Sequence, residues 1–541
     1  ETLKRWACAY DVFDYELDPE IAANDEEFMQ IASMLLDYNT RTILDFVTNH
    51  IAFDSPLIEK VDGLVLANRN ISAYDDTAIW LDNALRGASQ PINGSLSYIY
   101  HARAGEPGYN PPMMNLAQIN YMDKRAREYM IKTVLAKIAK LTLNGGLRAD
   151  LAFLAFRYNF YDTWGKPYGM SWEYFESLMP KEFWQEFMDE VNAIYPGMLI
   201  FAESYEFGDK EGSPWDGRAG AFVRLGMIPY DKHVFDLQKL GYIDLVRGYA
   251  FTEAPLDFMR RTVRFNENHD EPAARESFGS LDRAVVNTVI SATLPGYFLL
   301  PLRQLLDMAP AEGTRKEMKS ADAGVYEYSY PRIEQIIKNG AVADLVQFLR
   351  FLKDKLFSNS EFYSLWIAEL GRRVPEGCLK LSPGASREAV LAVTDWQEDS
   401  RGRVWEKIHQ NNTGIVTDLW RGQEYDLLIV SNASDEVFMA GFSAKSVFKY
   451  YNGTVRSLRE YFGPAAGKCA YEYDAKQQLL KVELPAWGWG VFVFRANPSV
   501  DCLVDMRSTS SPAQGVGALM RTEAHDAPAA GGSAYGGSSS V

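Results

Sequence analysis

Short apolar runs alternate with longer amphipathic segments over the first 300 residues. The runs at 43–47, 147–153, 198–203 and 262–265 have the length of strands. Segments between and before them, such as 129–141 and 183–194, repeat apolar residues at helical spacing. Asn24 and Glu27 have the spacing of a capping box, which predicts that a helix begins there. This alternation predicts an α/β architecture with parallel strands.

The four apolar runs share polar or ionisable residues inside them or just after their ends. Buried parallel strands are typically continuous apolar runs, and in a (β/α)₈ barrel the active site lies at their carboxyl ends. A single carboxylate after a strand more often just begins a loop. Four such strands in series favour a shared site.

The pattern changes along the chain and predicts three regions. Residues 1–384 are expected to form a partial (β/α) barrel, with an irregular inserted subdomain at about 51–117 that is rich in Asn, Pro, Gly and Tyr. Residues 385–497 alternate in the manner of strands and predict an antiparallel β-sandwich. Residues 498–541 are rich in Ala, Gly and Ser, and we expect a disordered tail.

The composition of the chain limits the kinds of partner that the protein is expected to bind. The 541-residue chain has a net charge of −17, which would repel a phosphate backbone, so nucleic acid is not expected. No apolar run is long enough for a transmembrane helix, so no membrane partner is expected. The four cysteines are widely spaced and indicate neither a zinc site nor a disulfide framework.

Four segments, in this order, resemble the signature regions of the α-amylase superfamily (glycoside hydrolase family 13): Asp45-Phe-Val-Thr-Asn49-His50, Gly146-Leu-Arg148-Ala-Asp150, Phe201-Ala-Glu203 and Phe265-Asn-Glu-Asn268-His269-Asp270. Residues 9–15 resemble the tyrosine-bearing segment that precedes them. The resemblance covers about residues 7–300 and, more weakly, the region to 496. It implies a (β/α)₈ TIM-type barrel. Two strands of that barrel would precede the tyrosine segment, and we expect them to be missing from this sequence.

The residue types also fit glycoside cleavage without reference to a family. That reaction needs two carboxyl groups that flank the scissile bond, one ionised and one protonated. Asp150 lies two residues from Arg148, so both side chains leave the same side of a strand, and we expect the guanidinium to lower the pKa of Asp150. Glu203 follows five uncharged residues, an environment that favours a protonated carboxyl.

By resemblance, Asp150 is the nucleophile and Glu203 is the general acid/base. Asp270 would bind sugar hydroxyls and stabilise the transition state. His50 and His269 would donate hydrogen bonds in the same subsite.

Four further residues have roles implied by the resemblance. Tyr10 would stack on the sugar, although from the residues alone it is more simply a core tyrosine. Arg148 would belong to the substrate-binding set, and Asp45 would support it structurally. Asn49 resembles a calcium ligand of secreted amylases, but one Asn does not make a calcium site, so no cofactor is predicted and calcium stays an alternative that the sequence does not support.

These features predict an α-amylase-like retaining glycosidase acting on an α-1,4-linked glucan, either an oligo- or a polysaccharide. A glucan or maltosyl transglycosylase would use the same carboxylates. An inactive truncated homologue, acting as a non-catalytic carbohydrate-binding protein, is the third reading. A dehydrogenase has no support because no Gly-rich dinucleotide motif follows a strand.

Overall fold

The fold is described from a computed structural model. The structure describes residues 10–19, 21–67, 90–92, 95–97, 99–103, 112–205, 214–302, 304–305, 334, 343–352, 396–398, 404–406, 415–421, 426–435, 438–443, 457–462, 470–474 and 479–495. The calls for residues 1–9 and for the tail at 498–541 therefore lie outside the described residues. Among the described residues, no helix has the length and apolar character needed to cross a membrane.

Parallel strands form the centre of the region predicted to be a barrel. The described residues contain six of them: β1 (Ile43–Val47), β7 (Gly146–Asp150), β8 (Leu199–Ala202), β9 (Ile228–Pro229), β10 (Val263–Phe265) and β11 (Tyr297–Leu299). The first four pair in the order β1-β7-β8-β9, and β10 pairs with β11. A parallel bridge from Tyr230 to Val263 joins the two groups. Closure of these strands into a barrel stays a prediction.

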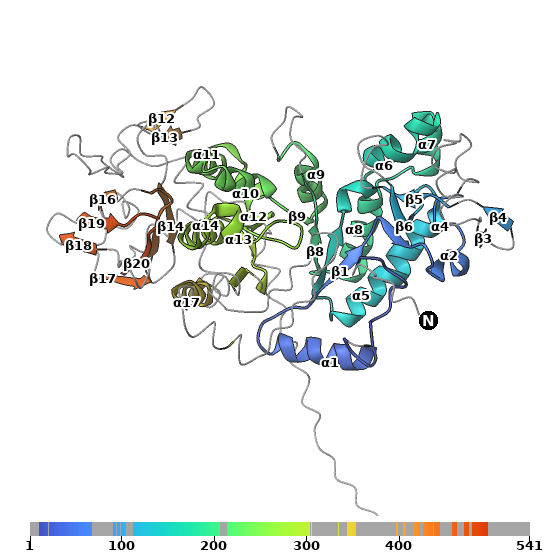
Figure 1. The fold of residues 1–541 in the computed structure, drawn as a ribbon, viewed down its shortest axis with the longest axis horizontal. Helices are drawn as coiled ribbons and strands as arrows, with labels where there is room; N and C mark the ends of the chain where they lie inside the picture. The colour runs from blue at the N-terminus through green and yellow to red at the C-terminus, as the bar shows by residue number, and fades with distance from the viewer. Residues whose placement is uncertain are drawn as a thin grey trace, which may run out of the picture. The chain divides into compact units, whose positions relative to one another are not determined.

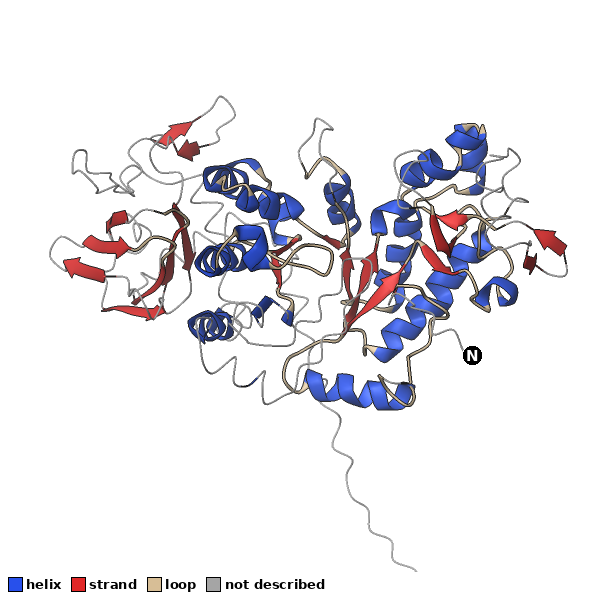
Figure 2. Ribbon diagram, viewed as in Figure 1, coloured by secondary structure: helices blue, strands red, loops and turns tan. Residues whose placement is uncertain are grey.

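Helices alternate with these strands, as the amphipathic pattern predicts (Figures 1 and 2). Those of the first half are α1 (Asp25–Leu36), α4 (Lys124–Tyr129), the π-helical η1 (Met130–Leu135), α5 (Ala136–Leu141), the 3₁₀ turns η2 (Ala152–Ala155) and η3 (Lys166–Tyr168), α6 (Arg157–Trp164), α7 (Trp172–Leu178) and α8 (Phe183–Ile194). Those of the second half are α9 (Arg218–Leu225), α10 (Lys232–Lys239), α11 (Ile243–Gly248), the π-helical η4 (Tyr249–Glu253), α12 (Leu256–Arg260), α13 (Ala274–Phe278), α14 (Leu281–Thr293) and α17 (Ala343–Phe351).

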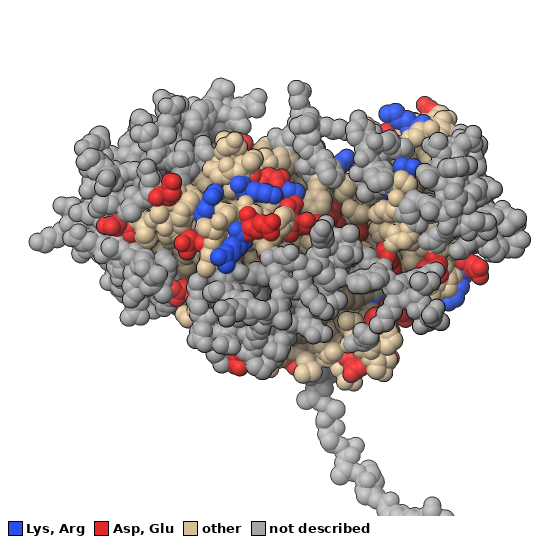
Figure 3. Space-filling model, in the orientation of Figure 1, with Lys and Arg blue, Asp and Glu red and all other residues tan. Residues whose placement is uncertain are grey.

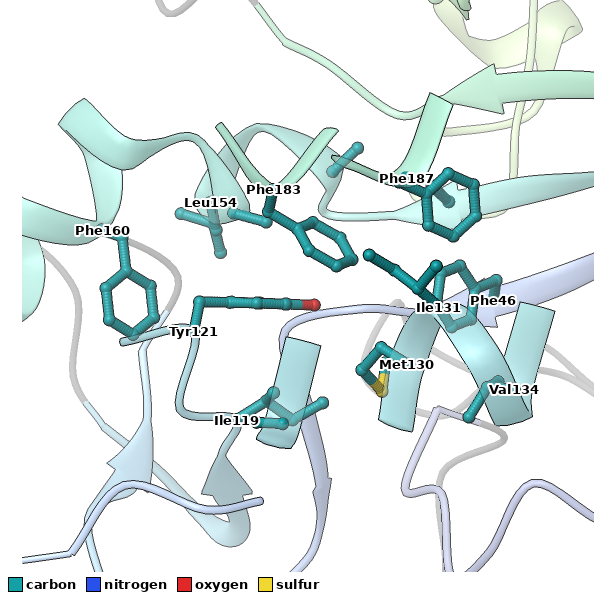
Figure 4. Packing of buried hydrophobic residues seen from close by; sticks show 14 of the residues in the cluster. Phe46, Ile119, Tyr121, Met130, Ile131, Val134, Leu154, Phe160, Phe183 and Phe187 are labelled. Carbon is teal, nitrogen blue, oxygen red and sulfur yellow. The ribbon is translucent and has the colours of Figure 1, made fainter. Parts of the chain in front are cut away.

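The apolar faces of these helices pack on the strands. In Figure 4, Phe183 and Phe187 from α8 lie beside Tyr121 and Phe46. Phe46 and Phe187 stack with their ring centroids 5.8 Å apart. Burial of such aromatic rings stabilises the packing of the helices against the strands.

Three local predictions can be compared with the structure. The capping box is confirmed, because Asn24 Oδ1 accepts from the Glu27 backbone N–H at 2.9 Å and Glu27 Oε2 accepts from that of Ala23 at 2.7 Å. The strand expected at 147–153 is shorter, because β7 ends at Asp150 and Leu151 adopts a left-handed conformation with φ 45°. Strand β9 was not predicted, because it has two residues and one of them is Pro229.

The described strands within and beside the insertion expected at about 51–117 pair in an antiparallel manner. Strands β2 (His50–Ala52), β6 (Met113–Gln118) and β5 (His101–Ala102) pair in that order. A separate hairpin joins β3 (Gln90–Ile92) to β4 (Ser95–Ser97), and α2 (Leu57–Lys60) is a single turn. Since β2 begins three residues after β1 ends, the insertion starts next to the carboxyl edge of the parallel strands.

The C-terminal region is antiparallel wherever the structure describes it. One sheet has the order β14 (Ile415–Arg421), β15 (Asp426–Asn432), β20 (Trp489–Arg495), β17 (Ser457–Phe462), and a second has the order β16 (Phe438–Ser443), β19 (Leu479–Leu484), β18 (Ala470–Asp474). A hairpin joins β12 (Trp396–Glu398) to β13 (Val404–Glu406). The predicted strands are thus present, whereas their assembly into a sandwich and the domain boundaries stay predictions.

Candidate active site

The predicted site residues gather where the parallel strands end. Asp150 is the last residue of β7, Glu203 follows β8 directly, and Asp270 lies five residues after β10. The β1–β7 register pairs Asp45 with Arg148, which brings their side chains to the same level of the sheet. Because parallel strands share their carboxyl edge, residues far apart in sequence meet there.

Arg148 lies at the centre of this group. Its Nη1 atom is 3.0 Å from Asp45 Oδ1 and 2.9 Å from Asp150 Oδ1. Its Nη2 atom is 2.7 Å from Glu203 Oε2, and its Nε donates to the Tyr230 hydroxyl at 3.3 Å. One guanidinium therefore forms ion pairs with three carboxyl groups, which come from three neighbouring strands.

Glu203 is fixed through one of its two oxygens. Its Oε2 atom accepts from the Leu151 backbone N–H at 2.8 Å and also pairs with Arg148. Leu151 makes this contact from the left-handed conformation, which costs a non-glycine residue roughly 1–2 kcal/mol. The backbone turn that ends β7 thus places a donor on Glu203 Oε2.

The expected direction of the Asp150 pKa shift is wrong. Burial raises the pKa of Asp150 well above its ordinary value, and the neighbouring Glu203 raises it further. Arg148 acts in the predicted direction, but its single charge is shared with the carboxyl groups of Asp45 and Glu203. The crowded carboxyl groups favour a proton shared within the site, a pattern found in paired catalytic carboxyls.

Asp270 borders the same group from the loop after β10. Its Oδ2 atom lies 3.3 Å from His269 Nε2 and accepts from the Tyr205 hydroxyl at 3.4 Å. Burial raises the pKa of Asp270; His269 opposes this shift and Glu203 adds to it. The side chain is 43 % exposed, so it is open to a ligand in a way that Asp150 is not.

Tyr10 and the two predicted histidines lie around this centre. The Tyr10 ring stacks on His269 with centroids 5.3 Å apart, and its hydroxyl donates to Asp45 Oδ2 at 3.1 Å. His50 is buried, and burial lowers its pKa to about 4, against the opposing effect of the Tyr10 backbone. At neutral pH the His50 ring is therefore uncharged.

The residues around Asn49 do not fit a calcium site. Gln118 Nε2 donates to Asn49 Oδ1 at 3.1 Å and to the Asn49 carbonyl at 2.9 Å, and Asn49 Nδ2 donates to the Arg103 carbonyl at 3.2 Å. Calcium requires oxygen ligands, whereas here an N–H donor occupies both Asn49 oxygens. Among the described residues, no group of three or more His, Cys, Asp or Glu side chains is placed to hold a metal.

Three residues of the site were not predicted from the sequence. Tyr205 donates to Asp270 Oδ2, Tyr230 accepts from Arg148, and Asn268 Oδ1 accepts from the Asp270 backbone N–H. Tyr205 follows Glu203 by two residues, a spacing that could have suggested it, whereas Tyr230 follows the unrecognised strand β9.

Comparison with known proteins gives a likeness of fold. No protein-family model matches the sequence, and no curated protein matches it. The α-amylase from H. orenii has a similar structure, with 14% identity, a TM-score of 0.51, and coverage of 90% of this chain and 87% of that one. The α-amylase from Geobacillus thermoleovorans, complexed with acarbose, has 15% identity, a TM-score of 0.50, and coverage of 91% and 84%. An Anoxybacillus α-amylase has 13% identity, a TM-score of 0.51, and coverage of 91% and 84%. The chain therefore has a fold similar to that of the α-amylases, as the signature segments had indicated.

Proposed function

We propose that the protein is a retaining glycoside hydrolase that cleaves α-1,4-linked glucans. The observation that carries this proposal is the Arg148 centre, which holds Asp150 and Glu203 from adjacent strands with Asp270 beside them. A retaining mechanism requires two carboxyl groups in one site, one ionised as the nucleophile and one protonated as the acid. The substrate class follows from the signature segments and from the similar fold of the α-amylases.

In the first step, Asp150 attacks the anomeric carbon while Glu203 gives its proton to the departing glycosidic oxygen. In the second step, Glu203 takes a proton from water, and the resulting hydroxide cleaves the bond between Asp150 and the sugar. The separation of about 5–5.5 Å that retaining enzymes show between these carboxyl groups stays a prediction here.

The surrounding charges suit the transition state of this reaction. Asp45, Asp150, Glu203 and Asp270 lie around a single guanidinium, so carboxyl groups outnumber the cationic partner. An oxocarbenium-like transition state carries positive charge on the sugar, and an acidic site prepared in advance stabilises it. His50, which is neutral at pH 7, adds no competing positive charge.

Asp150→Asn tests the proposal. The amide is close in size but cannot form the covalent intermediate, so the release of reducing ends from maltooligosaccharides should fall by several orders of magnitude. Asp45→Asn is the matched control, because it removes a carboxylate from Arg148 without removing the nucleophile, and its loss should be smaller.

Three outcomes would count against the proposal in different ways. Substantial turnover by folded Asp150→Asn would show that Asp150 is not the nucleophile. Oligosaccharides longer than the substrate would indicate a transglycosylase. Glucan binding without any turnover by the unsubstituted protein would favour a non-catalytic carbohydrate-binding protein.

A further inference from the structure

Tyr205 lies between the general acid/base and Asp270. It follows Glu203 by two residues, at the carboxyl end of β8. Its hydroxyl donates to Asp270 Oδ2 at 3.4 Å and accepts from Asn268 Nδ2 at 3.0 Å. The Glu203 side chain lies close enough to raise the pKa of Tyr205. A single hydroxyl therefore donates to one carboxyl group and lies near the other.

Asn268 determines which way the Tyr205 proton points. An amide nitrogen can only donate, so the Tyr205 oxygen must accept from it, and the one hydroxyl hydrogen is left for a carboxyl group. Asn268 is itself held in place, because its Oδ1 atom accepts the backbone N–H groups of Asp270 and Glu271, both at 2.9 Å. The loop after β10 thus orients the hydroxyl toward the carboxyl groups.

Tyr205 keeps its proton under all working conditions. Burial raises its pKa far above the ordinary value of about 10, and the charges of Glu203 and Asp270 raise it further. The titratable groups facing it are Glu203 on its own segment, Asp270 on the loop after β10, and Tyr230 after β9. His269 lies beside Asp270, and Arg148 lies beside Glu203.

We propose that Tyr205 is a positioning residue whose hydroxyl donates to Asp270 while Glu203 is protonated, and to Glu203 once that residue has given up its proton. This inference rests on the proposed function. No bond to hydrogen breaks in Tyr205; only the direction of its O–H changes. The hydroxyl would stabilise the negative charge that develops on Glu203 as the glycosidic oxygen departs, and it would hold Asp270 in place before that.

A simpler role for Tyr205 is packing, since its ring lies 6.2 Å from that of Tyr230. Tyr205→Phe separates the two, because it keeps the ring and removes the hydroxyl. Tyr161→Phe is the matched control, since the Tyr161 hydroxyl donates to the Met170 carbonyl at 2.9 Å. Both variants lose one hydrogen bond donated by a tyrosine hydroxyl, but of the two only Tyr205 donates to a carboxyl group.

The first measurement compares two aryl maltosides, one with a good leaving group and one with a poor one. Only the poor leaving group needs the proton of Glu203. Tyr205→Phe should lower kcat for that substrate by about 10- to 100-fold, the range for a lost hydrogen bond to a charged group, with little change in KM. The loss for the good leaving group should be clearly smaller. Equal losses for both substrates, or no loss for either, would overturn the proposal.

The second measurement does not depend on activity. Loss of a donor to carboxylates destabilises the folded protein only when they are ionised, so the melting penalty of Tyr205→Phe should increase from pH 4 to pH 8. The penalty of Tyr161→Phe should not change with pH, because its acceptor is a backbone carbonyl. A pH-independent penalty for Tyr205→Phe would refute the contact with the carboxyl groups. Absence of hydrolysis by the unsubstituted protein would instead refute the proposed function, and the melting comparison would still decide the role of Tyr205.

Discussion

Asp150 shows that a charged neighbour in the sequence does not by itself predict the direction of a pKa shift. The Arg148-x-Asp150 spacing correctly places a guanidinium 2.9 Å from the carboxylate. The sequence does not show that Asp45 and Glu203, which are 105 and 53 residues away from Asp150 along the chain, share the same guanidinium. Burial and the charge of Glu203 then outweigh one shared cation, and they reverse the direction of the pKa shift.

This reversal has a consequence for stability. A carboxyl group whose pKa is higher in the folded than in the unfolded protein binds more protons when folded. Stability therefore falls as the pH rises from the ordinary carboxyl pKa of about 3.9 up to the raised folded value. Ionisation of Asp150 therefore opposes folding, as expected of a site arranged for chemistry.

We predict that Asp150→Asn melts at a higher temperature than the unsubstituted protein at pH 8, and that the difference narrows toward pH 4. The amide carries no charge at either pH, so it removes the repulsion from Glu203 only where Asp150 would be ionised. Melting curves across this pH range measure the difference. If Asp150→Asn instead melts below the unsubstituted protein, and by more at pH 8 than at pH 4, then Arg148 stabilises ionised Asp150 more than burial and Glu203 destabilise it.

At the scale of elements, the strands that could be predicted were those long enough to show a pattern. Strands β1, β7, β8 and β10 lie in largely apolar runs, and the ionisable residues inside them or just after their carboxyl ends mark the candidate site. Strand β9 has two residues and a proline, so no pattern reveals it. Tyr230 was missed for the same reason, although its hydroxyl accepts from Arg148 Nε at 3.3 Å.

In the antiparallel strands next to the site, the buried Gln118 side chain connects several strand ends through hydrogen bonds. Gln118, at the end of β6, donates to both oxygens of Asn49, and its Oε1 accepts the Arg103 backbone N–H at 3.4 Å. Gln118 is fully buried. One side-chain amide thus connects the ends of β1, β5 and β6 through three hydrogen bonds.

We predict that a chelator leaves the melting temperature unchanged, whereas Gln118→Met lowers it. Met is similar in size but leaves the buried Oδ1 of Asn49 without its donor, which should cost about 1–3 kcal/mol, whereas the Asn49 carbonyl still accepts from the Ile119 backbone N–H. Urea unfolding with and without EDTA, on both forms, measures the two effects. A fall in stability with EDTA that added calcium restores would show that a cation binds here after all.

At the scale of the whole molecule, acidic and basic side chains are interspersed over the described part of the face in Figure 3. Ion pairs of this kind occur among the described residues, since Lys232 Nζ lies 2.6 Å from Asp236 Oδ1 and 3.0 Å from Glu271 Oε1. The chain's net charge of −17 is therefore not gathered into one acidic patch on that part of the face. Sequence composition gave the total charge, but it could not give this local pairing.

The C-terminal strands and the helices of the parallel region share one apolar cluster. Trp489 of β20 and Ile429 of β15 are buried in the same cluster as Val289 of α14 and Phe348 of α17. The rings of Trp489 and Phe348 lie 5.1 Å apart. The change of pattern near residue 385 suggested a separate domain. The spacing of apolar residues predicts whether a segment is a helix or a strand, but it does not predict which elements pack against each other. The shared cluster implies that the two regions stabilise each other.

We predict that Trp489→Ala destabilises both regions together, by about 3–5 kcal/mol, since truncation of a buried tryptophan leaves a large cavity. Hydrogen exchange measured by peptide should show protection lost in α14 as well as in β14 and β15. Val482→Ala is the control, because Val482 is equally buried in β19 but lies outside the shared cluster. It should raise exchange in 479–484 and leave α14 protected. Were Trp489→Ala to loosen only the C-terminal strands, the two regions would be independent folding units, and the boundary near 385 would mark a true domain border. Loss of protection in α14 would instead mean that the C-terminal strands support the helices behind the candidate active site.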